Sequence, residues 1–226
     1  MNRTETENRY VQILSTGVRL EGILSSPADA KGLVLFVHGS GSSRNSPRNQ
    51  YVAQTLQEAG LATLLFDLLT PEEEQVDLRT QHLRFDVHLL ARRTAGVLEW
   101  TNLQPYTHEF KIGLFGSSAG AAAALMAAVE LPDMVEAVVS RGGRPDLANE
   151  VLSKVRAPTL LIVGSLDELV IELNEKALKQ MTTGSEKKLA IVPGASHLFE
   201  EPGALEDAAR LASEWFQTHL NKVSVS

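Results

Sequence analysis

The sequence predicts an α/β protein with a mostly parallel, twisted sheet and helices on both faces of that sheet. The first observation behind this prediction is that six short apolar runs alternate with segments long enough to form helices. Strands that are apolar throughout are typical of a parallel sheet buried on both faces. The six runs are 33–37, 62–68, 111–115, 135–139, 160–163 and 189–192.

A second observation places an antiparallel hairpin at the start of the sheet. Segments 10–14 and 18–24 are rich in strand-forming residues, and they flank Ser15, Thr16 and Gly17, which suit a tight turn. We therefore expect two antiparallel strands before the first parallel one.

Several helices have recognisable boundaries. A proline begins the segment 47–60, a threonine and a proline precede three glutamates in 70–74, and Pro145 opens a short helix. The three glutamates are interpreted as a charged helix start that the helix dipole favours. The last helix is expected over about 203–219, where apolar residues recur at spacings of three and four and should pack on the sheet.

The composition is that of an ordinary globular protein. The 226 residues are 43% hydrophobic and 22% charged, and no linker, charge block or repeat divides them. We therefore expect one domain over residues 1–226. The net charge of −7 argues against a nucleic-acid-binding protein, because affinity for phosphates depends on clustered lysines and arginines. Small molecules are the expected partners.

The sequence also limits the location and the chemistry. The first eight residues are polar and no apolar stretch approaches membrane-spanning length. Neither a secretory signal nor a membrane partner is expected, and the predicted location is cytoplasmic. Because the chain has no cysteine, a thiolate nucleophile, a disulfide framework and a cysteine-bound zinc are excluded.

The most informative motif is Gly116-Ser117-Ser118-Ala119-Gly120, which stands between an apolar run and an alanine-rich segment. A G-x-S-x-G turn between a strand and a helix strains the backbone at its central serine and exposes the hydroxyl above the sheet edge. Ser118 is therefore the candidate nucleophile.

Two later segments supply the groups that a catalytic serine needs. A serine hydroxyl is a weak nucleophile, so it requires a base within hydrogen-bond reach and an acid that orients the base. Asp167 follows the run 160–163, and His197 follows the run 189–192. All three candidates thus follow strands of the expected sheet, in the chain order Ser, Asp, His. We predict that His197 is the general base and that Asp167 orients it.

A further component would stabilise the negative charge that develops on the attacked carbonyl oxygen. The run 33–37 leads into a glycine- and serine-rich loop, residues 38–42. In this arrangement the backbone N–H groups of Ser40 and Ala119 are the expected donors of the oxyanion hole.

With these motifs the chain resembles the α/β-hydrolase superfamily over nearly its whole length. Its small size, and the short segment between Val139 and Thr159 where many members insert a lid, resemble the dienelactone hydrolase group. The resemblance implies an α/β-hydrolase fold without a cap domain, an open site, small substrates and no cofactor. Dienelactone hydrolases proper are known for a cysteine nucleophile. Ser118 at that position favours a hydrolase of carboxylic esters, lactones or related acyl substrates.

Arginines give one indication of specificity. Arg44 and Arg48 follow the first parallel strand, and Arg141 and Arg144 follow the strand after the nucleophile helix. If these loops meet near Ser118, the guanidinium groups would hold a carboxylate or a phosphate. We hypothesise an anionic small ester or lactone as the substrate.

Other polar residues have simpler interpretations. We expect His38 to shape its loop by hydrogen bonding and Asp67 to brace loops. Asp146 could replace Asp167 as the acid, although a role as a helix cap explains it more simply.

Other chemistries and functions remain open or are disfavoured by the sequence. His82 and His88 do not share a helical face and no H-E-x-x-H motif occurs, so no metal site is predicted. The same triad would serve an acyltransferase or a peptidase, and an inactive hydrolase-fold interaction protein would retain the fold. The sequence does not indicate the oligomeric state.

Overall fold

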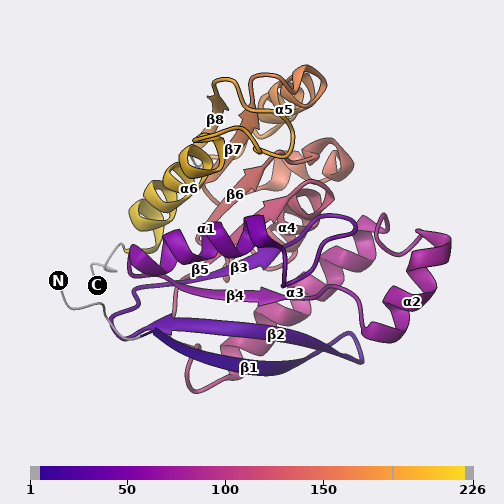
Figure 1. The fold of residues 1–226 in the computed structure, drawn as a ribbon, viewed down its shortest axis with the longest axis vertical. Helices are drawn as coiled ribbons and strands as arrows, with labels where there is room; N and C mark the ends of the chain where they lie inside the picture. Colours follow the sequence, from indigo (N-terminus) through magenta and orange to yellow (C-terminus); the bar gives the residue numbers. More distant parts are fainter. Residues whose placement is uncertain (1–5, 185, 222–226) are drawn as a thin grey trace.

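The computed structural model describes residues 6–184 and 186–221, and eight strands of this part form one sheet (Figure 1). The strands are β1 (Thr6–Ser15), β2 (Val18–Pro27), β3 (Leu33–Val37), β4 (Ala62–Phe66), β5 (Ile112–Ser117), β6 (Ala137–Arg141), β7 (Thr159–Gly164) and β8 (Lys187–Val192). Their order across the sheet is β1-β2-β4-β3-β5-β6-β7-β8. Strands β3 to β8 pair in parallel, whereas β2 is antiparallel to both β1 and β4.

The hairpin is confirmed, and its strands are longer than the sequence predicted. Thr16 and Gly17 have φ angles of 49° and 78°. Positive φ at both central residues matches the right-handed twist of a hairpin and closes it in two residues. The ladder then runs without interruption from the pair Ser15 and Val18 to the pair Thr6 and Pro27.

Helices cover both faces of the sheet, as predicted. Helices α1 and α6 pack on one face, and α3, α4 and α5 pack on the other (Figure 1). The helices are α1 (Pro47–Glu58), α2 (Pro71–Thr80), α3 (Val87–Leu103), α4 (Ala119–Glu130), α5 (Glu168–Gln180) and α6 (Ala204–Leu220), with short 3₁₀ helices η1 (Pro145–Ala148) and η2 (Leu152–Lys154).

The two faces of the sheet form separate apolar clusters. Every residue of β3, β4, β6 and β7 is buried, which explains why these strands read as continuous apolar runs. Helix α4 approaches the central strands closely because Ala121 to Ala124 are fully buried and present only methyl groups. This close approach fixes the position of its first residue at the sheet edge.

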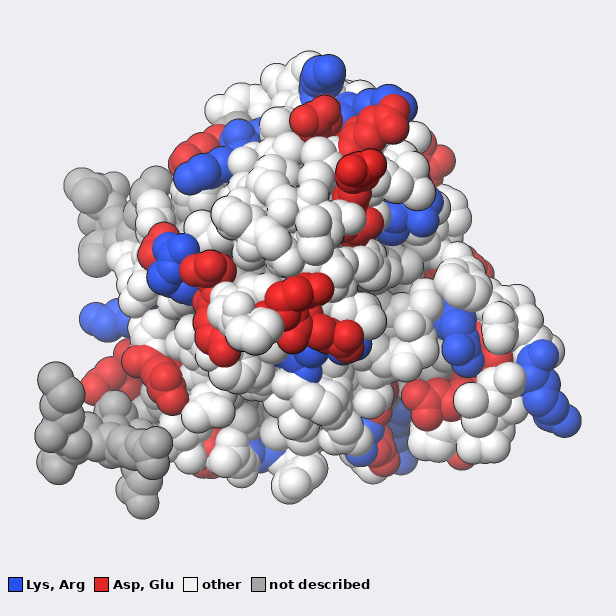
Figure 2. Space-filling model, turned by 45° about the horizontal axis from the view of Figure 1, so that its top comes forward, with Lys and Arg blue, Asp and Glu red and all other residues white. Residues whose placement is uncertain are grey.

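Between β6 and β7 the chain forms only η1 and η2. The predicted absence of a cap domain is therefore confirmed. No helix in the described ranges is long and apolar enough to span a membrane. On the face drawn in Figure 2, acidic and basic side chains lie interspersed.

The glutamates at the start of α2 do more than complement the helix dipole. Thr70 and Glu73 form a capping box, in which each side chain accepts a hydrogen bond from the backbone N–H of the other residue. Glu73 also receives two hydrogen bonds of 2.5 Å from the guanidinium of Arg93 in α3, a side chain that is only 3% exposed. Glu73 therefore joins two helices.

Candidate active site

Ser118 lies at the sharp turn between β5 and α4. Its backbone has a φ of 50° and a ψ of −126°, a conformation that costs a residue with a side chain about 1–3 kcal/mol. The turn is held by a hydrogen bond from the Ser118 N–H to the Arg141 carbonyl oxygen at 3.4 Å, and by one from the Arg144 N–H to the Ser118 carbonyl oxygen at 3.0 Å. Strain of this kind is what the motif predicts at its central residue.

The two glycines of the motif are required by close backbone contacts. A Cβ atom at Gly116 would lie 2.5 Å from Ala121 Cα, and one at Gly120 would lie 2.2 Å from the Val37 carbonyl oxygen. Any side chain at either position would push α4 away from the sheet edge. The glycines therefore allow the serine and the loop after β3 to lie side by side.

His197 and Asp167 form a direct hydrogen bond. The His197 Nδ1 lies 2.6 Å from Asp167 Oδ2, and the side chains are 41% and 14% exposed. Their loops meet because Gly164, at the end of β7, packs against the loop after β8, where a Cβ atom would lie 2.2 Å from the Ala195 carbonyl oxygen. The bond engages Nδ1 of the imidazole and leaves Nε2 as the second ring nitrogen.

Ser118 and His197 converge on the segment that follows β6. Ser118 is bonded to the backbone of Arg141 and Arg144, and a Cβ atom at Gly142, between them, would lie 3.7 Å from His197 Cε1. Among the described residues, neither Ser118 Oγ nor His197 Nε2 makes a hydrogen bond. Bonds of this kind are often long in free enzymes and shorten when a substrate binds.

The loop after β3 lies directly against the serine. A Cβ atom at Gly39 would be 2.9 Å from Ser118 Cβ. The Ser40 N–H donates to no acceptor within the described residues, and the Ala119 N–H, at the first position of α4, has no acceptor within the helix. These are the two N–H groups that the sequence analysis assigned to the oxyanion hole.

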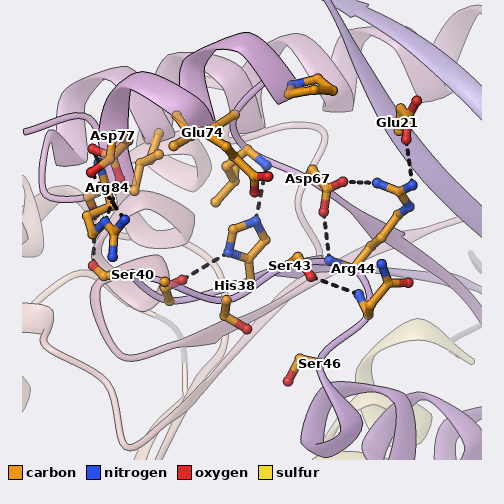
Figure 3. Close-up of a pocket in the computed structure, with 18 of the residues that line it drawn as sticks. Glu21, His38, Ser40, Ser43, Arg44, Ser46, Asp67, Glu74, Asp77 and Arg84 are labelled. Carbon is orange, nitrogen blue, oxygen red and sulfur yellow. Dashed lines mark hydrogen bonds and ion pairs between the residues drawn. The ribbon is translucent and has the colours of Figure 1, made fainter. Parts of the chain in front are cut away.

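A cavity of about 770 Å³ lies beside this loop (Figure 3). Its wall is formed by the loop and the start of α1, residues 38–48, together with the end of β4 and the segment around α2. Arg84 and Asp77 lie side by side in this wall, with Arg84 Nε 2.5 Å from Asp77 Oδ2. Several of the charged residues labelled in Figure 3 pair with one another in this way. The cavity wall is therefore polar, and its charge is largely compensated.

Arg44 is one of these compensated groups, which corrects its expected role in anion binding. Its guanidinium pairs with Asp67 and with Glu21 (Figure 3), and its backbone N–H donates to Asp67 Oδ1 at 2.8 Å. Two carboxylates on one guanidinium compensate its charge, which argues against anion binding by Arg44. The contacts of Asp67 agree with the expectation that it braces loops.

Arg141 has the opposite surroundings. The residue is 8% exposed, Nη2 donates to Asn49 Oδ1 at 3.4 Å, and the buried Nη1 has no partner among the described residues. The guanidinium carbon lies 5.8 and 5.9 Å from the ring centres of Phe115 and Phe199. Burial lowers the pKa of Arg141 to about 10, with a smaller contribution from Arg48, so the group remains charged at neutral pH.

The other two arginines have partners nearer the surface. Arg48 Nη1 lies 3.3 Å from Glu200 Oε1, with the Arg48 side chain partly exposed and the Glu200 side chain well exposed. Arg144 donates two hydrogen bonds of 2.8 Å to Asp146. The expected helix-cap role of Asp146 is therefore wrong: its carboxylate is occupied by Arg144, and η1 has no side-chain cap.

The order of these groups along the chain and their meeting at one sheet edge invite comparison with known families. The model of the dienelactone hydrolase family matches residues 20–221. The chain belongs to the dienelactone hydrolase family. Its fold is the α/β-hydrolase fold, as the sequence predicted.

Individual relatives of this dienelactone hydrolase family member agree with that assignment. The crystal structure of a dienelactone hydrolase from Anabaena variabilis ATCC 29413 is 59% identical, covers 95% of this chain and 99% of that one, and superposes with a TM-score of 0.93. A protein of Aquifex aeolicus (strain VF5), provisionally named a carboxymethylenebutenolidase, is 22% identical over 228 residues, which is 94% of this chain and 99% of that protein.

A longer relative carries a different name. A protein of Mycobacterium tuberculosis (strain H37Rv), provisionally named a phosphoribosyl transferase, is 53% identical over 210 residues. The match covers 93% of this family member but only 46% of the relative. The chain thus spans about half the length of this curated relative.

Sequence reasoning missed several residues that build the site. Gly164 brings the loops of Asp167 and His197 together, and its place just before Ser165 at a strand end was the available signal. Asn49, the buried partner of Arg141, gave no signal, because it lies 92 positions away in a helix start. For His38 the loop-shaping role was expected, but its two bonding partners were not.

Proposed function

We propose that this member of the dienelactone hydrolase family is a serine hydrolase that cleaves small carboxylic esters or lactones through an acyl-enzyme on Ser118. The observation that carries the proposal is the 2.6 Å bond between His197 and Asp167, on loops that meet the segment bonded to the strained Ser118 turn. A nucleophile, a base and an orienting acid at one sheet edge are the parts that acyl transfer requires.

The chemistry divides into two transfers. Ser118 Oγ attacks the acyl carbon while its proton passes to His197 Nε2, and Asp167 stabilises the imidazolium that forms. The bond from the acyl carbon to the leaving oxygen then breaks, and His197 returns the proton to that oxygen. Water attacks the acyl-enzyme by the same route in reverse, releasing the acid and restoring the Ser118 hydroxyl.

The negative oxygen of each tetrahedral intermediate would be held by two backbone donors. The Ser40 and Ala119 N–H groups flank the serine and have no acceptor in the part of the chain that the structure describes. Because they are part of the backbone, they need little reorganisation when the charge forms, and one such donor is worth about 2.7–4 kcal/mol.

We further propose that the substrate is anionic and that Arg141 recognises it, with Arg48 as a second, more exposed contributor. Among the residues that the structure describes, Arg141 has an unpaired Nη1 and no carboxylate partner, and a buried guanidinium in this state is costly unless a ligand compensates it. Arg141 also supplies the carbonyl that holds the Ser118 turn. A carboxylate on the substrate would thus bind a short distance from the reacting carbonyl.

Labelling and product release test the nucleophile directly. The wild-type protein should be labelled by a fluorophosphonate and should release a burst of nitrophenolate from p-nitrophenyl acetate. Ser118→Ala should lose both, whereas Ser117→Ala, a matched control at the adjacent buried serine, should keep both. Labelling of Ser118→Ala, or no labelling of the wild type, would show that the proposed chemistry is wrong.

A pair of esters tests the anion site. Arg141→Gln should lower kcat/KM for a carboxylate-bearing ester by about 10- to 150-fold relative to its neutral analogue, because a hydrogen bond to a charged group is worth about 1.5–3 kcal/mol. Arg144→Gln serves as the control, since that guanidinium is already paired with Asp146. An equal loss on both esters would contradict anion recognition by Arg141.

A hydrolase and an acyltransferase with this triad would differ only in the molecule that accepts the acyl group from Ser118. If water is the main acceptor, competing alcohols and amines should divert little product, whereas an acyltransferase would give mainly the new ester or amide. The phosphoribosyl transferase name belongs to a relative of which this chain matches 46%. For the matched part we propose hydrolysis alone.

A further inference from the structure

His38 is a buried histidine that the proposed chemistry does not use. It follows β3 directly, is 8% exposed, and lies at the edge of the cavity beside the loop 39–44 (Figure 3). Both ring nitrogens are engaged: Nδ1 lies 2.9 Å from the Gly39 carbonyl oxygen, and Nε2 accepts a hydrogen bond from the Leu68 N–H at 3.1 Å.

These two contacts determine the protonation of the ring. A backbone N–H can only donate, so Nε2 must carry no proton where it meets Leu68. The proton of the neutral ring is therefore on Nδ1, which donates it to the Gly39 carbonyl oxygen. Burial lowers the pKa of His38, although the bond to Gly39 opposes that shift, and a lowered pKa agrees with a neutral imidazole.

The bond from His38 to Gly39 orients the next peptide group. No peptide bond in the described part of the chain is cis, so the Gly39 C=O and the Ser40 N–H point in opposite directions. In the sheet order, β4 and β5 lie on opposite sides of β3. Leu68 follows β4 on the side of the His38 ring, and Ser118 follows β5 on the other side.

We propose that His38 is a positioning residue of the oxyanion hole, which holds the Gly39 carbonyl toward the β4 side and thereby directs the Ser40 N–H toward the oxygen bound at Ser118. This inference rests on the proposed function. Two further contacts support the same loop: the Ser42 N–H donates to the Gly39 carbonyl oxygen at 3.2 Å, and Ser40 Oγ donates to the Arg84 carbonyl oxygen at 2.8 Å. Neither contact can replace the hydrogen bond that the Gly39 carbonyl oxygen accepts from the side of the His38 ring.

Two amide variants separate the contacts of the ring. In His38→Asn the amide nitrogen occupies the place of Nδ1 and can still donate to Gly39. In His38→Gln the amide oxygen reaches the place of Nε2 and can still accept from Leu68, but the side-chain donor to Gly39 is lost and its carbonyl oxygen keeps only the Ser42 N–H. A residue that merely fills space or joins two loops would respond alike to both changes.

The test has a structural part and a kinetic part. Crystal structures should show the Gly39–Ser40 peptide unchanged in His38→Asn and rotated in His38→Gln, a readout that does not depend on turnover. With p-nitrophenyl acetate, His38→Gln should lower kcat about 100-fold, the loss typical of one oxyanion donor, with KM changed less than about threefold. His38→Asn should recover most of the rate, and the two variants should melt at similar temperatures.

An unchanged peptide in His38→Gln, or equal losses of kcat in both variants that follow their melting temperatures, would overturn the positioning role. Failure of the proposed function is distinguishable, because it would appear as a wild-type protein without esterase activity or phosphonate labelling. Even without activity, the orientation of the Gly39–Ser40 peptide in the wild type, His38→Asn and His38→Gln would show whether His38 positions this peptide.

Discussion

At the scale of single residues, the site depends on which charges have partners. Arg44, Arg84 and Arg144 are each paired with a carboxylate of the protein, whereas within residues 6–184 and 186–221 the side chain of the buried Arg141 hydrogen-bonds only to an amide oxygen. A guanidinium without an acid is unusual among buried groups. The same distinction applies to Asp146 and Asp167, because one carboxylate is occupied by an arginine and the other is bonded to the candidate base.

This distinction predicts different effects for two aspartates. Asp167→Asn should reduce kcat/KM with p-nitrophenyl acetate by about 10²- to 10⁴-fold, because an amide cannot stabilise the imidazolium and favours the wrong tautomer of His197. Steady-state kinetics with circular dichroism of each variant would measure this. Asp146→Asn is the control and should keep most of the activity, since it loses only a partly exposed pair with Arg144. A larger loss of kcat/KM in Asp146→Asn than in Asp167→Asn would indicate that Asp146 is the orienting acid.

The residues that sequence could predict are those named by a local motif. Ser118 is predicted from its turn, and Asp167 and His197 are predicted from their places after strands. The pairing of Arg44 with Glu21, 23 positions earlier on β2, could not be predicted, because no local pattern indicates which strands become neighbours. The same holds for the buried contact of Arg141 with Asn49.

At the scale of elements, each strand and helix is fixed by features that the sequence displays only in part. The continuous apolar runs identified the strands well, because a strand buried on both faces has no polar alternation. The capping box of α2 was only partly anticipated, since the glutamates were interpreted through the helix dipole alone. The missing part was Arg93, 20 positions later in α3.

The pair of Glu73 and Arg93 gives a prediction for stability. Hydrogen bonding by Arg93 holds the pKa of Glu73 below its ordinary value. The stabilisation is therefore fully present above the ordinary pKa of a glutamate and is lost as the pH falls through the lower folded value. Glu73→Gln should lower the free energy of unfolding at pH 7 by about 2–3 kcal/mol, because it leaves the buried Arg93 without its carboxylate while Glu73 itself is partly exposed.

Urea denaturation at pH 7 and at successively lower pH would test this prediction. The difference between wild type and Glu73→Gln should shrink at the acidic end. Glu74→Gln, on the exposed side of the same turn, should change stability by less than about 0.5 kcal/mol. A difference that is constant with pH would mean that the carboxylate charge of Glu73 does not contribute.

At the scale of the whole molecule, the parallel sheet gathers distant residues at one edge. The proposed nucleophile follows β5, the proposed acid β7 and the proposed base β8, and the loop proposed to form the oxyanion hole follows β3. Parallel strands bring all their carboxyl ends to the same side, so groups separated by up to 159 positions meet without any long insertion. The short connection between β6 and β7 leaves this edge without a cap domain.

The sequence predicts the overall topology best. It predicts least well the detailed geometry of the sheet edge where the candidate site lies. Rules for parallel connections restrict the order of strands, so the pattern of runs sufficed for the fold. The close approach of Gly164 to the loop of His197, and of Gly39 to Ser118, depends on packing between loops. Such contacts have no periodic pattern in the sequence.

The central claim is that Ser118, His197 and Asp167 act together on a carbonyl carbon beside two backbone donors. A crystal structure of the protein after reaction with a small fluorophosphonate tests it most directly. We predict phosphorus bonded to Ser118 Oγ, its oxygen about 2.7–3.1 Å from the Ser40 and Ala119 nitrogens, and His197 Nε2 within about 2.6–3.2 Å of an oxygen on the adduct. Phosphorus on another residue, or an imidazole of His197 that remains far from the adduct, would contradict the account.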